Sequence, residues 1–404
     1  MFIGMNSKKI HIRFDETATD GVSIKAGLKP GSKRYDIFFR SNDISLTKNT
    51  EALLSVGLLP AMKTRSTLVA NGVISQKLFN AIEPISNFFH TLNPHLKKIK
   101  IKNLVPQPTK PPKKNRVGVF FSAGVDSFYT LLKHQEEITD LIFIRGFDIP
   151  LTDKVLLKKT SEIIREIGLK FGKRVIEVET NLRTFYEHSF IKPNLRWQYA
   201  HGAALASVGH VLFPFFRRIY IAASHTFADN YPPYLGSHPA LDPLWNTEAL
   251  EFIHDGCEAT RVNKAALIAK SDLALQSLRA CGKNIEGAYN CGMCEKCIRT
   301  MINLHSVGAL ERCTTFNNKI DIQRISELKI RDFSERAFIG ENLRALENRP
   351  DDRELYNALF KVWKQAWWVQ IPVNYPKLYR LFQIRWIYRM LRRMGKTSTK
   401  FVVR

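Results

Sequence analysis

The sequence lacks three features that define large classes of proteins. It has no run of eighteen apolar residues, so no transmembrane helix is expected. Its start, from Met1 to Lys9, has no apolar core of a secretory leader, which favours a cytoplasmic location. Its 6 cysteines in 404 residues are too few for a disulfide-stapled scaffold. These absences predict a cytoplasmic globular protein.

Acidic residues are unevenly distributed along the sequence and are scarce at both ends. Residues 355–404 hold 11 Lys or Arg and no Asp or Glu, and residues 1–115 hold 19 basic against 7 acidic residues. Residues 116–354 hold 31 against 30, so the formal net charge of +24 belongs to the two flanks. A polyanionic partner such as nucleic acid would therefore bind through the basic N- and C-terminal regions. The alternative is a charge excess that only keeps the protein in solution.

A stretch rich in proline and lysine, residues 106–115, divides the sequence and is typical of a linker. The first 105 residues predict a small α+β domain. Its expected strands cover residues 9–14, 21–25 and 35–40, and its expected helices cover 51–59 and 74–92.

Beyond the linker, short apolar strands alternate with helices, which predicts a doubly wound parallel sheet over residues 116–315. Ligands of such folds bind at the carboxyl ends of the strands. The composition of residues 316–404 predicts a helical, basic C-terminal region. The expected strands are 117–121, 141–147, 174–179 and 218–224, and the expected helices are 126–136, 153–171 and 198–212.

The segment Ser122-Ala123-Gly124-Val125-Asp126-Ser127 lies between a predicted strand and a predicted helix. Small residues let the backbone approach an anion, and the N–H groups of a helix start face it. Ser122 and Ser127 add hydroxyl donors, and Asp126 could hold Mg²⁺ or organise the loop. The segment matches neither a Walker A loop nor a dinucleotide fingerprint. It predicts a phosphate-binding loop, against the alternative of a plain strand–helix turn.

Four cysteines form the pattern C-x9-C-x2-C-x2-C. Tetrahedral Zn²⁺ takes four such thiolates, and with every position filled by protein the ion would be structural. An iron–sulfur cluster can use similar spacings, but zinc is favoured. The expected ligands are Cys281, Cys291, Cys294 and Cys297.

The loop at 122–127 resembles the S-G-G-x-D-S motif of the PP-loop ATP pyrophosphatases, with Ala123 in place of the first glycine. Together with the cysteine cluster and Ile298-Arg299, it resembles 7-cyano-7-deazaguanine synthase over about residues 116–305. The resemblance implies a HUP-type adenine-nucleotide α-hydrolase fold that holds zinc. It also implies an enzyme that cleaves ATP to AMP and pyrophosphate and adenylates a carboxylate or amide for attack by a nitrogen nucleophile. The extra flanks favour the extended relatives of antiphage defence gene clusters, which implies partner proteins from the same operon.

The resemblance also assigns residues to ATP and to catalysis. Lys264 falls where related enzymes place a lysine that neutralises phosphate charge, although a solvated helix charge explains it equally well. Position alone points to His225, which follows the fourth predicted strand, where an acid or base could act. Asp148 follows the second strand, beside the expected adenosine of this fold class, although a plain loop cap explains it equally well. The nucleotide-binding set is Ser122, Ala123, Gly124, Val125, Asp126, Ser127 and Asp148, and the catalytic set is Asp126, Lys264 and His225.

Two other functions stay open. Cys257, close to His254 in the sequence, would be the reactive cysteine of a PP-loop tRNA thiolase, unless it is only a small buried side chain. Ala123 hints at a catalytically silent nucleotide-binding subunit of a defence complex.

Residues 236–245 could line a substrate pocket. Residues 378–394 predict a basic amphipathic helix that would meet nucleic acid, an anionic membrane, an acidic partner or the core.

Overall fold

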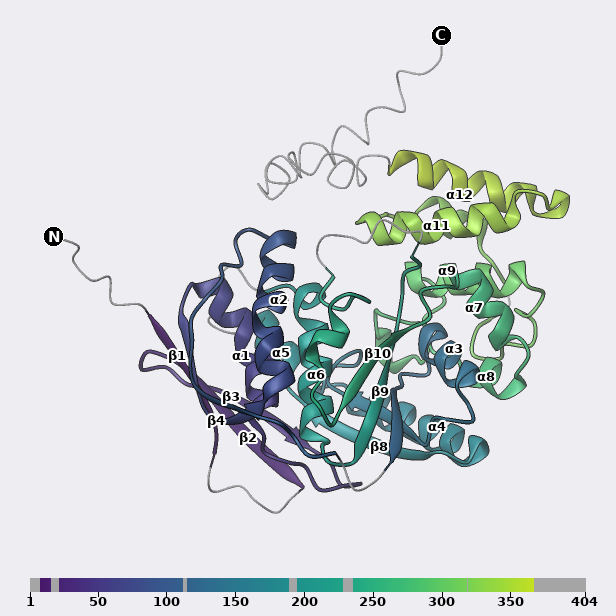
Figure 1. Ribbon diagram of the computed structural model, residues 1–404. Coiled ribbons are helices and arrows are strands. Elements are labelled where there is room, and N and C mark those ends of the chain that lie inside the picture. Colours follow the sequence, from purple (N-terminus) through teal and green to yellow (C-terminus); the bar gives the residue numbers. More distant parts are fainter. Residues whose placement is uncertain are drawn as a thin grey trace, which may run out of the picture. The chain divides into compact units, whose positions relative to one another are not determined.

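The computed structural model describes residues 8–15, 22–111, 115–188, 195–227, 235–317 and 319–366. The chain divides into two compact units (Figure 1). Unit 1 comprises Met1–Ala223 and Tyr234–Cys257, and unit 2 comprises Ser224–Pro233 and Glu258–Arg404. The expected basic helix at 378–394 lies outside the described residues. No helix of the described part is long and apolar enough to cross a membrane.

Unit 1 is built on a single ten-stranded sheet in the order β10-β9-β6-β7-β8-β3-β2-β1-β4-β5. Six of its neighbouring pairs are parallel, and the three pairs from β8 to β1 are antiparallel. The strands are β1 (Lys9–Phe14), β2 (Ser23–Pro30), β3 (Tyr35–Arg40), β4 (Thr67–Ser75), β5 (Ile101–Gln107), β6 (Arg116–Phe120), β7 (Asp140–Arg145), β8 (Arg174–Thr180), β9 (Phe216–Ala222) and β10 (Glu251–Asp255).

The parallel part of the sheet, β6 to β10, follows from short apolar sequences. In β7 five of the six residues are buried, as expected for a strand covered on both faces. The chain leaves β6 toward β7 and β8 on one side, and later adds β9 and β10 on the other. The order of connection therefore reverses between β6 and β9, and such a switch point is where open α/β sheets bind ligands.

The first 107 residues share this sheet instead of forming a separate body. β3 pairs with β8 through Phe39–Thr180 and Arg40–Glu179, and one apolar core extends from Ile10 to Phe252. The expected linker is partly strand, because Pro106 lies on the edge strand β5, where a missing N–H is tolerated. The compact units thus divide near residues 223 and 258 and not at the proline-rich stretch.

The helices of unit 1 cover the sheet and are capped by ordinary sequence signals. Asp153 caps the start of α4 by accepting from the N–H of Leu156, and Gly172 ends it in the left-handed region at φ +64°. α1 packs against β4 and against α6. The helices are α1 (Thr50–Thr64), α2 (Gln76–Leu92), α3 (Val125–Lys133), α4 (Lys154–Phe171), α5 (Leu182–His188), α6 (Trp197–Val211) and the 3₁₀ turn η1 (Asp242–Trp245).

The described part of unit 2 is helical and has its own apolar core. Ile302, Ile339 and Leu359 bring α9, α11 and α12 together there. The elements are α7 (Arg261–Ile268), α8 (Asp272–Ser277), η2 (Ile285–Gly287), α9 (Glu295–Ser306), α10 (Ile322–Ser326), α11 (Phe333–Leu346), η3 (Pro350–Asp352) and α12 (Arg353–Gln365). The prediction of an α/β fold with a mostly parallel central sheet is confirmed.

Candidate functional site

The expected phosphate loop lies between β6 and α3, at the carboxyl end of β6 and beside the switch point. Ala123 takes the left-handed conformation with φ +56° and is fully buried. An L-residue pays about 1–2 kcal/mol for this conformation, which glycine adopts freely. The loop thus takes a left-handed turn although it has alanine, and not glycine, at that position.

Ser127 organises the loop from within. Its hydroxyl accepts the N–H of Gly124 at 3.1 Å and that of Ser122 at 3.4 Å, and it donates to the carbonyl of Gly124 at 3.1 Å. The side chain expected to contact phosphate therefore holds the backbone of the loop. α3 begins directly after Gly124, and the first N–H groups of a helix have no partner within it. Asp126 is half-buried on this first turn.

The end of β7, the neighbour of β6 in the sheet, is followed by an exposed loop residue. β7 ends at Arg145, and Gly146 turns the chain with φ +101°. A side chain there would meet the carbonyl oxygen of Thr180 at 2.2 Å, so only glycine fits. Asp148 is exposed on the loop that follows. The structure places it beyond the strand end and not within a buried site.

Asp255, at the end of β10, ties the sheet to α3. Its carboxylate accepts from Thr130 at 2.9 Å and from Lys133 at 2.8 Å, and it lies 2.9 Å from Nε2 of His134. The carboxylate is nearly buried, and all three partners lie on the last turns of α3 or just beyond it. The sequence analysis did not find Asp255. Its partners lie 121 to 125 residues away in the sequence, so no local pattern marked it.

A second polar group lies near the end of β10. Ser237 donates to Oδ2 of the buried Asp242 at 2.7 Å, and Nδ1 of His254 donates to the same oxygen at 2.7 Å. Burial lowers the pKa of His254, but Asp242 and the thiol of Cys257 outweigh it and raise the pKa to about 9. Of the expected pocket loop 236–245, Ser237 and Asp242 are thus engaged with His254, and Trp245 is buried in the core.

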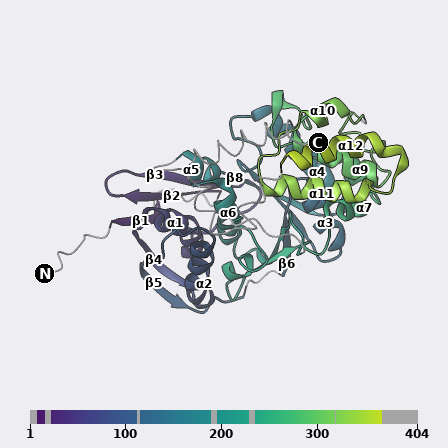
Figure 2. The ribbon, with the colours of Figure 1, turned by 90° about the horizontal axis from the view of Figure 1, so that it is seen from above.

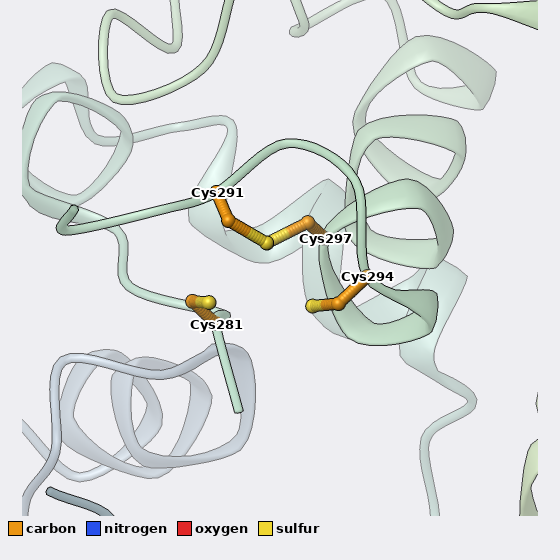
Figure 3. A group of neighbouring side chains, drawn as sticks. All are labelled: Cys281, Cys291, Cys294 and Cys297. Carbon is orange, nitrogen blue, oxygen red and sulfur yellow. The ribbon is translucent and has the colours of Figure 1, made fainter. Parts of the chain in front are cut away.

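Unit 2 holds the four cysteines, and their sulfur atoms all lie within 4.8 Å of one another (Figure 3). Sγ of Cys291 and Sγ of Cys297 are 3.9 Å apart. Zinc–sulfur bonds of about 2.3 Å place tetrahedral sulfurs about 3.8 Å apart, so small movements would complete the site. The four thiols fit a metal ion, and the prediction of a metal-binding cluster at Cys281, Cys291, Cys294 and Cys297 is confirmed to that extent.

Local sequence explains how the cysteines meet. Cys294 is the N-cap of α9, and Gly292 supplies a left-handed turn at φ +67° between Cys291 and Cys294. Hydrogen bonds from the thiol and the backbone N–H of Cys297 lower the pKa of Cys294 to about 4, which favours the thiolate that a metal needs.

Asn290 joins the two halves of the cluster. Its side-chain oxygen accepts the N–H of Ala280 at 2.8 Å and that of Cys281 at 3.1 Å. Its amide donates to the carbonyl of Leu278 at 2.8 Å. Because Asn290 directly precedes Cys291, these bonds hold the distant Cys281 beside the other three ligands. The sequence analysis missed this residue, since an asparagine near cysteines carries no distinctive pattern.

The remaining expected site residues lie in unit 2. Lys264 is buried on α7, with 1% of its surface exposed, so it is not a solvated helix charge. His225 is also buried; its Nε2 lies 3.1 Å from the hydroxyl of Ser334, and its ring stacks on Phe338 at 4.9 Å. The guanidinium groups of Arg261 and Arg299 lie over the ring of Phe338, at 4.6 and 4.1 Å from its centre.

Comparison with known proteins identifies no relative, so inference about function rests on the residues of the chain itself. The chain matches no protein-family model, no curated protein and no solved structure.

Proposed function

We propose that this protein binds ATP at the loop of residues 122–127 and cleaves it to AMP and pyrophosphate, adenylating a carboxylate or amide of a deazaguanine-type base. The observation that carries the proposal is the loop itself. It joins β6 to α3 beside the switch point of the sheet, it has small residues, and it keeps a left-handed turn at Ala123. Its likeness to the PP-loop motif supports AMP formation, and the cysteine cluster that follows supports a synthase-like enzyme.

The reaction would develop negative charge on the phosphates, and groups at the loop would stabilise that charge. An oxygen of the substrate attacks the α-phosphorus, and pyrophosphate leaves with the electron pair of the broken P–O bond. The N–H groups at the start of α3, at the positive end of the helix dipole, would face the position where that negative charge gathers. Asp126 would hold Mg²⁺, which supplies a counter-charge to the phosphates. A nitrogen nucleophile, either ammonia or an amine of a partner protein, then displaces AMP from the activated carbon.

The four cysteines would hold Zn²⁺ in a structural role. With every coordination position filled by a thiolate, no position is open for substrate. The ion would fix the segment from Cys281 to α9. The flanks outside the region of resemblance support the branch of relatives found in antiphage defence gene clusters, in which partner proteins from the same operon would supply or receive the product.

Analysis of the products of ATP turnover tests the proposal. Purified protein is incubated with ATP and Mg²⁺, with and without 7-carboxy-7-deazaguanine, and nucleotides are separated by chromatography. We expect AMP and pyrophosphate only when the base is present, and no AMP with Asp126→Ala. Asp272→Ala, a change of the same type at an exposed aspartate outside the predicted site, serves as the matched control. ADP and phosphate as products would contradict the proposal.

One observation favours a second function, a tRNA thiolase. The Asp242 carboxylate orients His254, whose pKa responds to the thiol of Cys257, so a cysteine lies next to a polarised histidine. In this case tRNA would stimulate AMP formation, and Cys257→Ser would abolish sulfur transfer. Cys313→Ser, which changes another buried cysteine, would leave it intact. Full activity of the Cys257 variant would exclude this function.

A further inference from the structure

In the part of the chain that the structure describes, the helices leave one face of the N-terminal half of the sheet uncovered. α1 and α2 pack against β1, β4 and β5 on the other face (Figures 1 and 2). On β1 the buried residues Ile10 and Ile12 alternate with the exposed residues Lys9, His11 and Arg13. The buried set joins the core with α1, so the exposed set points away from it.

The neighbouring strands continue this basic set. Strand register places His11 opposite Lys29 and Arg13 opposite Gly27, so Lys25 and Lys29 of β2 share the face. Phe38 of β3 lies opposite Lys25, and the guanidinium of Arg40 lies 5.8 Å from the centre of the Phe38 ring. We call the residues of this surface the basic sheet face: Lys9, His11, Arg13, Lys25, Lys29, Phe38 and Arg40.

Most cations of the basic sheet face lack an acidic partner within the part of the chain that the structure describes. Among the described residues, Lys9, Arg13, Lys25 and Lys29 make no ion pair. The nearby acids Asp15 and Asp36 both bind Arg34, and Arg40 lies 3.6 Å from Glu179. A surface of unpaired cations with one half-buried aromatic ring is complementary to an anionic polymer that also offers flat rings to stack.

The shape of the face selects among nucleic acids. The strands β1, β2 and β3 that carry the face belong to one continuous sheet of ten strands, about 43 Å wide at the usual strand spacing of about 4.8 Å. That is wider than the major groove of DNA, about 12 Å, so the sheet cannot enter a duplex. Along β1 and along β2 its cations stand four residues, about 13 Å, apart, and an extended backbone can follow them. We propose that the basic sheet face binds single-stranded nucleic acid; this inference is independent of the proposed ATP chemistry.

The test is fluorescence anisotropy with a labelled twelve-nucleotide oligothymidine, using the full chain with its metal bound. The variant Lys9→Gln, Arg13→Gln, Lys25→Gln removes three exposed cations. We expect its affinity to fall at least tenfold near 0.1 M salt. The slope of log affinity against log salt should fall by about 2, because each lost phosphate contact contributes about 0.7 for a single strand.

A second triple variant, Lys154→Gln, Lys158→Gln, Lys170→Gln, is the matched control. It removes the same charge from exposed positions of α4. The proposal predicts near wild-type binding for this control, and weaker binding of a twelve-base-pair duplex by the wild-type protein. Equal losses in the two variants would overturn the proposal, because binding would then follow total charge. Unchanged binding by the first variant, or preference for the duplex, would also overturn it.

Discussion

The carboxylate of Asp255 accepts a hydrogen bond from the hydroxyl of Thr130 at 2.9 Å, and so joins the end of β10 to α3. Lys133 and His134 bind the same carboxylate. Since α3 begins at the phosphate loop, one acid at the far strand of the parallel sheet holds the helix whose first N–H groups would meet ATP. The loop is therefore supported by β10 as well as by β6.

Replacing Asp255 should destabilise unit 1. Asp255→Asn keeps the size of the side chain but leaves the ammonium of Lys133 without its carboxylate. We expect a loss of about 1–3 kcal/mol in the free energy of unfolding, the usual cost of breaking a partly buried charged hydrogen bond. Urea denaturation measures it. The control Asp272→Asn removes a mostly exposed partner of Arg312 and should change stability by less than about 0.5 kcal/mol. Equal effects of the two changes would refute the role given to Asp255.

The left-handed turn at Ala123 gives a second prediction. Ala123→Gly relieves about 1–2 kcal/mol of backbone strain, but loses a buried methyl and gains chain entropy in the unfolded state. Stability should therefore stay within about 1 kcal/mol of wild type. Ala123→Val places a β-branched side chain at φ +56° in a buried site and should cost at least about 2 kcal/mol. Thermal denaturation of both variants checks this, and a stable valine variant would show that the loop is not held in this turn.

The His254–Asp242 pair predicts how stability depends on pH. The pKa of His254 is raised to about 9, so the folded state binds its proton more tightly than the unfolded state. The stabilisation is fully present below pH 6.5 and is lost as the pH rises through about 9. The difference in unfolding free energy between wild type and Asp242→Asn should thus be larger at pH 6 than at pH 10. A difference that does not change with pH would contradict a charged His254.

The cysteine cluster predicts metal binding with specific losses. Wild-type protein should contain one zinc ion per chain by elemental analysis. Cys291→Ser should lose it, whereas Cys313→Ser should keep it, because Cys313 is buried apart from the cluster and donates to the carbonyl of Leu275. Asn290→Ala should weaken zinc binding by about 10- to 100-fold, since the side-chain bonds that hold Cys281 beside Cys291 would be lost. Visible absorbance and iron in place of zinc would indicate an iron–sulfur cluster.

Sequence periodicity was sufficient for most of the parallel sheet. The apolar runs that form β6, β7 and β8 and the capped helix α4 lie within a few residues of the predicted bounds. β4, β5 and β10 were missed. β4 contains Asn71-Gly72, which reads as a turn but here forms a bulge, with Gly72 at φ +145°. β10 mixes charged and apolar residues because Asp255 and His254 point to polar partners.

The candidate site was only partly accessible to sequence reasoning. The loop and the cysteines were found because their spacing reflects ligand geometry. Asn290 and Asp255 were not, and Asp242 was noted only as one residue of the expected pocket loop. Three partners of Asn290 lie 9 to 12 residues away and the hydroxyl partner of Asp255 lies 125 residues away, and no regular spacing records such contacts. The pairing of β3 with β8 was hidden for the same reason, since a proline-rich stretch resembles a domain boundary even when both flanks share one sheet.

Oxygen-isotope transfer tests the central claim, adenylation of the substrate, most directly. 7-Carboxy-7-deazaguanine labelled with ¹⁸O in its carboxylate is turned over with ATP, and the AMP is analysed by mass spectrometry. Adenylation forms a bond between a carboxylate oxygen and the α-phosphorus, and the later attack by nitrogen breaks the bond from that oxygen to carbon. The account predicts AMP carrying one ¹⁸O atom from the substrate. Turnover that yields unlabelled AMP, or ADP in its place, would contradict it.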